Sequence, residues 1–166
     1  MQDDTTAGRG ETAKLWSLIR QVGIAMLSTV EPDGSLRSRP MYTCNTEEGF
    51  DGALWFVTDR SDPKAFEVSH APEVGVVYAC TRDNVYVALS GRANLIDDRT
   101  RLERLWRDEL AKWFPKGKDD PNLALIRVDV FEGEYWDEPS SAASAAWKAV
   151  KTGLGSNDTG HAKVTL

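Results

Sequence analysis

Cysteine, histidine and long apolar stretches are scarce in this sequence. Its 166 residues include two cysteines and two histidines, and their spacing offers no CxxC, HExxH or paired His–Cys pattern for a metal site. Cys44 and Cys80 both lie in apolar segments, which favours buried thiols in a reducing compartment over a secreted disulfide framework. No stretch approaches the ~20 apolar residues that cross a bilayer, and no signal peptide opens the chain. We therefore expect a cytoplasmic protein without a metal or a membrane partner.

Positive charge is the second shortage. Lysine and arginine total 20 against 26 aspartates and glutamates, which gives a formal net charge of −6. Nucleic-acid binding draws most of its affinity from lysine and arginine contacts to phosphates, so this balance argues against a nucleic-acid partner. The length and the 41% hydrophobic content indicate one globular domain with its own apolar core.

Composition divides the chain into three parts. Residues 1–10 are polar and contain glycine, which predicts a disordered N-terminal arm. Residues 11–153 carry the apolar periodicity of a folded domain, which begins with an amphipathic helix that ends before Gly23. Residues 154–166 are predicted to be a mobile tail, and a small helix over 144–152 precedes it.

The folded part reads as six strands joined mainly by short turns. The turn at 31–34 has a proline to preset φ and a glycine to tolerate positive φ, so it predicts a hairpin. Runs of antiparallel hairpins with short helices between them predict a mainly β fold, namely a six-stranded antiparallel β-barrel that is closed or nearly closed. The predicted strands cover 24–30, 35–45, 53–58, 74–80, 84–95 and 123–136.

Two helices are expected between the strands. Asp62 is a strong N-cap and Pro63 is favoured at the first helical position, so a short helix starts here and ends at about His70. Asp97 and Asp98 cap the longest predicted helix. Its apolar stripe comprises Leu102, Leu105, Trp106, Leu110 and Trp113.

The start of the first of these helices is a candidate anion site. Thr58 ends a strand, and a turn with Ser61 leads into a helix whose first turn holds Lys64. The first turn of a helix has unpaired N–H groups and partial positive charge, to which Lys64 adds a full charge for a phosphate. An ordinary capped helix with a solvated lysine explains the segment equally well. The Asp62 carboxylate also counts against the anion, because it competes for the same N–H groups.

A second pair of cations lies in the strand 35–45. Arg37 and Arg39 share one face because strand side chains repeat every two residues, and the following Pro40 is typical of an edge or a bulge. The two arginines are either a solvated edge that prevents aggregation or, if this strand passes Lys64, the rest of a phosphate site. Three charge-assisted contacts give roughly 5–9 kcal/mol before ordering costs, comparable to the about −8 kcal/mol of a micromolar ligand.

The aromatic residues offer a platform for a flat ring. Trp16, Trp106 and Trp113 fall on helical stripes and are more simply core or dimer contacts. Trp136 ends the last predicted strand, and Tyr86 lies mid-strand with a hydroxyl that needs a partner. These two residues are the aromatic candidates for a ligand contact.

In their order and spacing, the motifs of the chain resemble the pyridoxamine 5′-phosphate oxidase-like split barrels that bind FMN. The motifs are DG-x4-RPM, LWFVT-x5-K, APEVGVVYA, SGRA, and the ending EYWDEPSSA followed by WKAVKTG. The ending is most similar to the general stress protein 26 group. The resemblance covers about residues 12–153 and implies a six-stranded split barrel that forms a homodimer, with two sites for FMN (or for FAD) at the subunit interface.

The resemblance also implies which residues hold the cofactor. Arg39 matches a strand arginine that contacts the flavin phosphate and ribityl chain. Lys64 matches the phosphate-binding lysine, with Ser61 in the same turn. Pro40 and Met41 match the backbone beside the isoalloxazine ring.

Four further positions align with family motifs, and at one of them, Tyr86, the residue type differs. Val57 and Thr58 match the hydrophobe–Thr pair that ends the third strand. Trp136 matches an aromatic that closes the flavin site from the partner chain. Tyr86 falls where the oxidases carry a glutamine that reaches the cofactor.

Two departures separate the chain from the oxidases themselves. Cys44 occupies the place of a lysine five residues after the strand arginine. The sequence at 138–142, EPSSA, stands where the oxidases carry the arginine and histidine that hold pyridoxal phosphate. The resemblance therefore implies a protein without pyridoxamine phosphate oxidase activity.

The leading hypothesis is an FMN-binding general stress protein, with flavin reductase-like oxidoreductase activity as an open question. One alternative keeps the fold and changes the ligand to the deazaflavin F420 or to haem. Another is a cofactor-free interaction protein whose barrel has lost its ligand, which the repulsion by Asp62 and the replacement at Cys44 favour.

Overall fold

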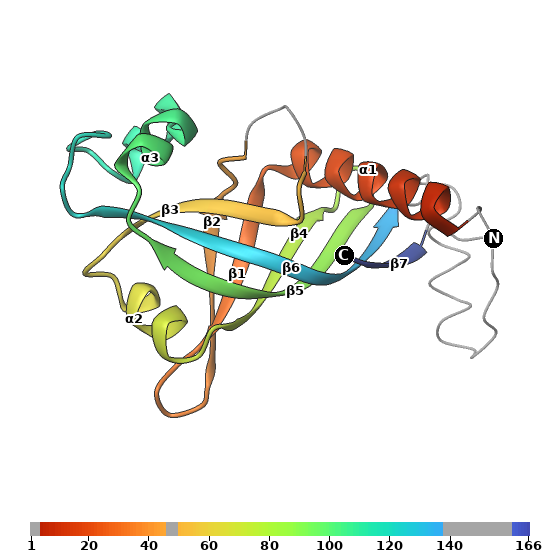
Figure 1. Ribbon diagram of the computed structural model, residues 1–166, viewed down its shortest axis with the longest axis horizontal. Helices are drawn as coiled ribbons and strands as arrows, with labels where there is room; N and C mark the ends of the chain where they lie inside the picture. The colour runs from red at the N-terminus through yellow and green to blue at the C-terminus, as the bar shows by residue number, and fades with distance from the viewer. Residues whose placement is uncertain (1–3, 46–49, 138–160) are drawn as a thin grey trace.

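A computed structural model describes residues 4–45, 50–137 and 161–166 of the chain. Their strands form one antiparallel sheet in the order β2-β1-β4-β5-β6-β3, and a seventh strand, β7, pairs with β6. The sheet is strongly curled, with α1 lying across one part and α2 and α3 near the other end (Figure 1). The elements are α1 (Asp4–Val22), β1 (Ile24–Val30), β2 (Leu36–Tyr42), β3 (Ala53–Asp59), α2 (Pro63–His70), β4 (Glu73–Cys80), β5 (Val85–Ile96), α3 (Arg99–Leu105), the 3₁₀ helix η1 (Asp108–Lys112), β6 (Leu123–Asp137) and β7 (His161–Thr165).

Two long strands, β5 and β6, run through the curled sheet. β5 has 12 residues and β6 has 15, and β6 pairs with β5 along nearly all of its length. A register shift between Ser90 and Gly91 marks a bulge, which bends a strand and increases its twist. The strand order begins with β2 and ends with β3, so the sheet is a half-barrel split between these two strands. The prediction of a mainly β, six-stranded antiparallel split barrel is confirmed.

The apolar core fills the inside of this half-barrel and continues behind β3. α1 contributes Leu15 and Ile19, both fully buried, to the main cluster. β3 is buried on both faces, because Phe56 faces the main cluster while Trp55 and Val57 face a second cluster with α3 and η1. Burial on both faces explains why this strand is a continuous apolar run without polar alternation.

Regular structure occurs at both ends of the described chain. α1 begins at Asp4, within the segment expected to be an N-terminal arm. β7 lies within the expected tail and pairs with the end of β6. The helix expected over 144–152 lies outside the described residues.

The predicted longest helix is divided in two. Asp98 caps α3 as expected, but the backbone is extended at Trp106, and the chain resumes as η1. Leu102, Leu105 and Leu110 all still reach the second cluster. The break therefore reorients the chain while its apolar contacts are kept, whereas Trp113, the last residue of the predicted stripe, is 55% exposed.

Substitution of Gly91 by alanine tests the bulge. An added Cβ would lie 2.6 Å from Val128 Cγ1 and 2.8 Å from the carbonyl oxygen of Asp129, and a backbone atom in a paired strand cannot swing aside as the end of a flexible side chain can. We expect Gly91→Ala to lower the free energy of unfolding by about 1–3 kcal/mol in urea denaturation. Gly10→Ala, in α1 with open space around it, is the control, and it should be neutral or stabilising. Equal stabilities of the two variants would contradict this account of the bulge.

Candidate functional site

The register of β2 turns Arg37 and Arg39 toward the inside of the half-barrel. Arg39 pairs with Leu27 and Arg37 pairs with Thr29, and both partners on β1 are fully buried. Cross-strand partners share a face, so the prediction that the two arginines lie on one face is confirmed. Pro40 pairs with Met26 and faces the opposite side of the sheet, where both are exposed.

Arg39 is held by a buried carboxylate on α2. Its Nη2 lies 2.8 Å from both carboxylate oxygens of Glu67, and its Nη1 donates to Thr29 Oγ1 at 2.6 Å. The Thr29 hydroxyl also donates to Glu67. Glu67 is 3% exposed and Thr29 0%. Because charged groups lose hydration when buried, this set is tolerated only through its charge-assisted hydrogen bonds, and these fix the guanidinium in one place.

Lys64 is folded back over the start of its own helix. Asp62 caps α2 and accepts from the Lys64 backbone N–H at 3.1 Å, and Pro63 occupies the first turn as expected. The Lys64 ammonium lies 2.5 Å from the other Asp62 carboxylate oxygen, and the lysine side chain is only 11% exposed. Asp62 therefore occupies both groups that the sequence offered to an anion, namely the N-terminus of α2 and the Lys64 ammonium.

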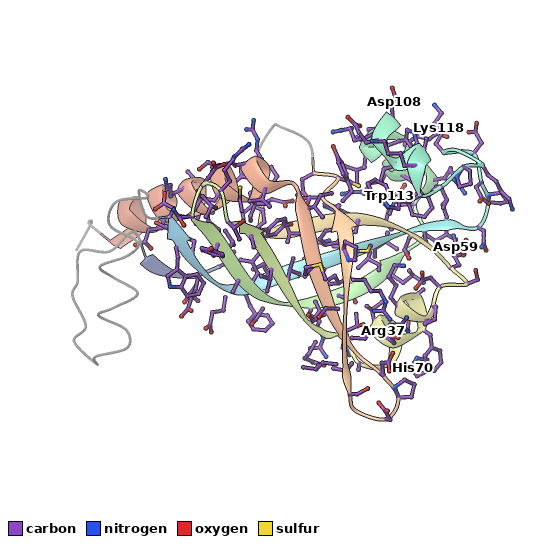
Figure 2. The ribbon with its side chains drawn as sticks, turned by 180° about the vertical axis from the view of Figure 1, so that it is seen from behind. Arg37, Asp59, His70, Asp108, Trp113 and Lys118 are labelled. Carbon is purple, nitrogen blue, oxygen red and sulfur yellow. The ribbon has the colours of Figure 1, made fainter. Side chains whose placement is uncertain are left out.

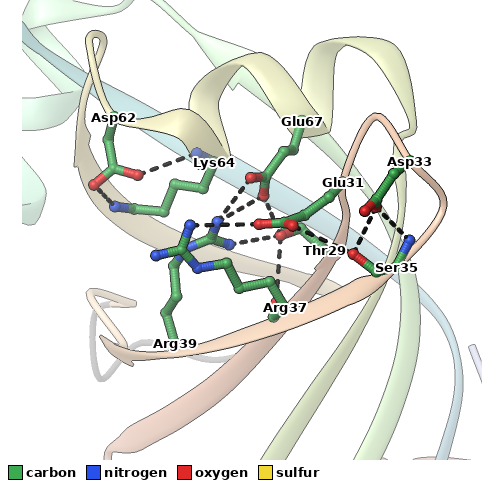
Figure 3. Close-up of polar contacts among 9 residues, drawn as sticks. All are labelled: Thr29, Glu31, Asp33, Ser35, Arg37, Arg39, Asp62, Lys64 and Glu67. Carbon is green, nitrogen blue, oxygen red and sulfur yellow. Dashed lines mark hydrogen bonds and ion pairs between the residues drawn. The ribbon is translucent and has the colours of Figure 1, made fainter.

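The two cations converge on the same small region, as Figure 3 shows for Arg39 and Lys64. Burial acts to raise the pKa of the Asp62 carboxyl, but hydrogen bonds from Lys64 and the charges of Lys64 and Arg39 outweigh it and lower the pKa. A residue on β2 and one on α2 thus act electrostatically on one carboxylate. This is the juxtaposition that a site for an anionic group requires.

Every cation in this region already has a carboxylate partner. Arg37 contacts Glu31 at 3.4 Å, in addition to the pairs Arg39–Glu67 and Lys64–Asp62 (Figure 3).

Sequence reasoning missed Glu67, although one signal was available. The charged residue lies three positions after Lys64, on a short helix whose buried face consists of Lys64, Ala65, Glu67 and Val68. A glutamate on a buried helix face needs a cation, but the sequence does not indicate which cation that is.

The other residues expected near the phosphate are already engaged. Thr58 is fully buried at the end of β3, and its hydroxyl contacts the Asp59 carbonyl oxygen at 3.3 Å. The Ser61 hydroxyl donates to Asp59 Oδ1 at 2.5 Å, although Ser61 itself is exposed. Val57 and Met41 are buried apolar residues, so each could offer a ligand little more than its backbone.

Tyr86 and Trp136 lie far from the cation pair within one chain. They are cross-strand partners on β5 and β6. Through β1 and β4, Arg39 aligns with Leu89 on β5, three strands away. Tyr86 lies three residues from Leu89 and so faces the outer side of the sheet, where it is 38% exposed, whereas Arg39 faces the inside. One subunit therefore does not bring these aromatics to Arg39 and Lys64.

The outer face of the sheet carries an exposed apolar patch, which we call the outer patch. Its residues are Ile24 (39% exposed), Met26 (41%), Val77 (42%) and Tyr86 (38%). Met26 and Val77 are cross-strand partners on β1 and β4, so the patch crosses neighbouring strands. Pro40, which pairs with Met26, extends it to β2. A contiguous apolar surface of this kind is typical of an interaction face.

Cys44 belongs to the second core cluster and not to the cation site. The residue is fully buried beside Trp55 and Leu110, and burial raises the pKa of its thiol to about 12. The thiol is therefore neutral and inert at physiological pH. Where the oxidases that the sequence resembles carry a lysine, this chain has an apolar contact.

The curled antiparallel half-barrel with a cation pair between its second strand and its first inter-strand helix defines a split-barrel protein. Residues 10–159 match the model of the family described as pyridoxamine 5′-phosphate oxidase like. The chain belongs to this family, as the resemblance in its motifs predicted. None of the helices in the described part of the chain is long and apolar enough to cross a membrane.

Relatives within the family include general stress proteins. General stress protein 26 of Bacillus subtilis (strain 168) is 31% identical over 79 residues, which cover 46% of this chain and 56% of that protein, so the match spans little more than half of its length. The crystal structure of General Stress Protein 26 from Bacillus anthracis str. Sterne is 27% identical with a TM-score of 0.66, covering 78% of this chain and 95% of that one. The general stress FMN/FAD binding protein of Xanthomonas citri is 26% identical with a TM-score of 0.65, covering 78% and 89%.

Removal of the Glu67 carboxylate tests the buried network. Glu67→Ala leaves the Arg39 guanidinium without its partner in a mostly buried position, so we expect the free energy of unfolding to fall by about 3–5 kcal/mol. Glu67→Gln should cost less, because the amide oxygen still accepts from Arg39. Chemical denaturation measures both, with the exposed Glu103→Ala as a control that should stay within about 0.5 kcal/mol of wild type. A Glu67→Ala variant as stable as this control would refute the network's importance.

Proposed function

We propose that this protein is a flavin-binding general stress protein and that Arg39 and Lys64 hold the phosphate of FMN at the start of α2. The observation that carries the proposal is the convergence of these two cations, which both act on the Asp62 carboxylate. Family membership supports it, since a relative of similar fold is described as an FMN/FAD binding protein. FAD is the alternative flavin.

The donor set suits a phosphate monoester. The side chains of Arg39 and Lys64 are 13% and 11% exposed, so contacts to an anion would be little screened by water and salt. Pro40 and Met41 adjoin Arg39 on β2, and Val57 and Thr58 end β3. Because Val57 and Thr58 are buried, we assign to them backbone contacts with the flavin and not side-chain contacts.

A second copy of the chain completes the proposed site. Tyr86 and its cross-strand partner Trp136 lie on the outer face of the sheet, whereas Arg39 of their own subunit faces the inside. Tyr86 belongs to the outer patch, and Trp136 is its neighbour. We propose that the outer patches of two subunits pack together in a homodimer, so that these aromatics approach the flavin of the partner. Apolar burial across the patch supplies the driving force.

Bound flavin would supply any redox chemistry, by accepting and donating hydride or single electrons. The chain's own residues bind the phosphate, orient the ring and exclude water. Flavin reductase-like activity is the enzymatic form of this proposal. Pyridoxamine phosphate oxidase activity is not expected, because the sequence EPSSA at 138–142 offers no arginine or histidine for a pyridoxal phosphate substrate.

One observation favours a second function, that of a cofactor-free interaction protein. All three cations of the region are paired with carboxylates, so the local charge is balanced without a ligand. The visible spectrum of the freshly purified protein, with chromatography of whatever heat releases, separates the two functions. A yellow protein that releases FMN supports the first. A colourless protein that gains no thermal stability from added FMN supports the second.

Neutralisation of Lys64 tests the phosphate assignment. Lys64→Met keeps the buried aliphatic stem and removes the charge, so FMN binding should weaken by about 1–3 kcal/mol in fluorescence titration. Lys112→Met, an exposed lysine on η1, is the matched control and should bind as wild type does. Arg39→Ala is a poor test, because it would strand the buried Glu67 and destabilise the fold. Unchanged affinity in Lys64→Met would remove Lys64 from the site.

A charge placed in the outer patch tests the dimer. Val77→Lys puts an ammonium at the centre of the patch, and we expect sedimentation equilibrium to show a monomer where wild type is a dimer. FMN affinity should fall with it, because the partner's aromatics are lost. Phe66→Lys, on the 52% exposed Phe66 of α2, is the control that should leave the dimer intact. A dimeric Val77→Lys protein would show that the subunits meet elsewhere.

A further inference from the structure

The carboxylates that balance the cation site differ in how firmly they are held. Glu67 is 2% exposed at its side chain and makes three contacts, two with Arg39 and one with Thr29. The Asp62 side chain is 33% exposed, and among the described residues its carboxylate forms hydrogen bonds and ion pairs with Lys64 alone, through the ammonium and the backbone N–H. Glu67 therefore cannot leave without stranding a buried arginine, whereas Asp62 can rotate into water.

Asp62 also occupies the groups that a phosphate would need. One of its oxygens accepts from a backbone N–H in the first turn of α2, and the other pairs with the Lys64 ammonium. The positive charge of Arg39 also helps to lower the pKa of the Asp62 carboxyl. The Asp62 carboxylate thus makes the interactions that a bound anion would make: it accepts from a helix N–H, pairs with Lys64 and is attracted by Arg39.

We propose that Asp62 is a built-in competitor that the flavin phosphate must displace, and that it sets the affinity of the site. The inference rests on the proposed function. An FMN phosphate carries close to two negative charges at pH 7.5, so Asp62 opposes it both by occupying Lys64 and by repulsion from its displaced position. Riboflavin lacks the phosphate, so Asp62 does not oppose it. The consequence is a flavin that is held more weakly and exchanges faster than the two cations alone would allow.

Asparagine at this position isolates the charge. Asparagine and aspartate are equally good N-caps, so Asp62→Asn keeps the cap of α2 while it frees the Lys64 ammonium. We expect Asp62→Asn to bind FMN roughly tenfold more tightly, or more, because a like charge is removed from a poorly screened site. Riboflavin affinity should not change. Asp62→Ser, a second neutral cap, should shift the FMN affinity in the same direction.

Asp98→Asn is the matched control. Asp98 caps α3 with a 2.9 Å contact to the backbone N–H of Arg101 and pairs with that arginine's side chain at 3.6 Å, so it too is an N-cap aspartate paired with a cation of its own helix. Its partner Arg101 belongs to α3, whereas the cation site is built by β2 and α2, and Figure 2 shows Asp108, which follows α3, apart from Arg37 of β2. In the described part of the chain, Asp98 makes no hydrogen bond or ion pair with Arg39, Asp62 or Lys64. Asp98→Asn should therefore leave the affinity for FMN unchanged.

The titrations use the full chain at fixed salt, with FMN and riboflavin as probes and thermal unfolding to check the fold. Tighter FMN binding in Asp62→Asn and Asp62→Ser, with riboflavin and Asp98→Asn unchanged, is the expected result. Equal or weaker FMN binding in the two Asp62 variants overturns this inference alone, since wild-type binding still supports the proposed function. A parallel gain for riboflavin also overturns it, because the effect would then not act on the phosphate. Absence of FMN binding in every variant overturns the proposed function and this inference together.

Discussion

The bidentate pair between Arg39 and Glu67 is the interaction on which the rest of the site depends. It joins β2 to α2 across the inside of the half-barrel, and Thr29 adds β1 to the same set. Two charges withdrawn from water cost several kcal/mol each, and the mutual attraction and the hydrogen bonds offset this cost without a large surplus. The main effect of the pair is therefore to fix the arrangement of these elements, and its net contribution to the free energy of folding is small. It fixes where β2 lies relative to the start of α2, and so brings Lys64 to the same place as Arg39.

The two faces of the sheet impose the second constraint. Arg39 of β2 faces the inside of the half-barrel, whereas Tyr86 of β5 lies on the outer face, three strands away. A cofactor that needs both the cation pair and the aromatics cannot be enclosed by one chain, because the sheet lies between them. The outer patch, which includes Tyr86, is on that outer face. The proposals of a dimer and of a flavin site are thus linked, since the same strand geometry that separates the half-sites also exposes the apolar surface.

Much of this arrangement could be predicted from the sequence where local chemistry decides it. The hairpin at 31–34 forms because Gly34 adopts a φ of 85° and closes a 2.9 Å hydrogen bond to the Glu31 carbonyl oxygen, as the turn residues indicate. Asp62 and Pro63 likewise specify the start of α2. The pairing of Arg39 with Glu67 could not be read in this way. It joins residues 28 positions apart, and their proximity follows from how α2 packs on β1 and β5 and not from any local pattern.

The break after α3 escaped prediction for a related reason. The stripe from Leu102 to Leu110 has helical spacing, but the chain turns at Trp106 and still buries the leucines. Tertiary contacts with β3 and β6 decide the backbone there, and a periodicity argument has no access to them.

The burial of Cys44 in the second core cluster affects how many cations the site can have. α3 and η1 cover the outer side of β3, and the leucines that they bury surround the thiol. A lysine at this position would place an ammonium in an apolar cluster without a carboxylate partner, so the packing of α3 and η1 is compatible with cysteine and not with lysine. The covering of β3 therefore keeps a third cation out of this position, so the proposed phosphate site depends on Arg39 and Lys64. With Glu67 held opposite Arg39, the ion pair between Asp62 and Lys64 is the adjustable element closest to the proposed phosphate position.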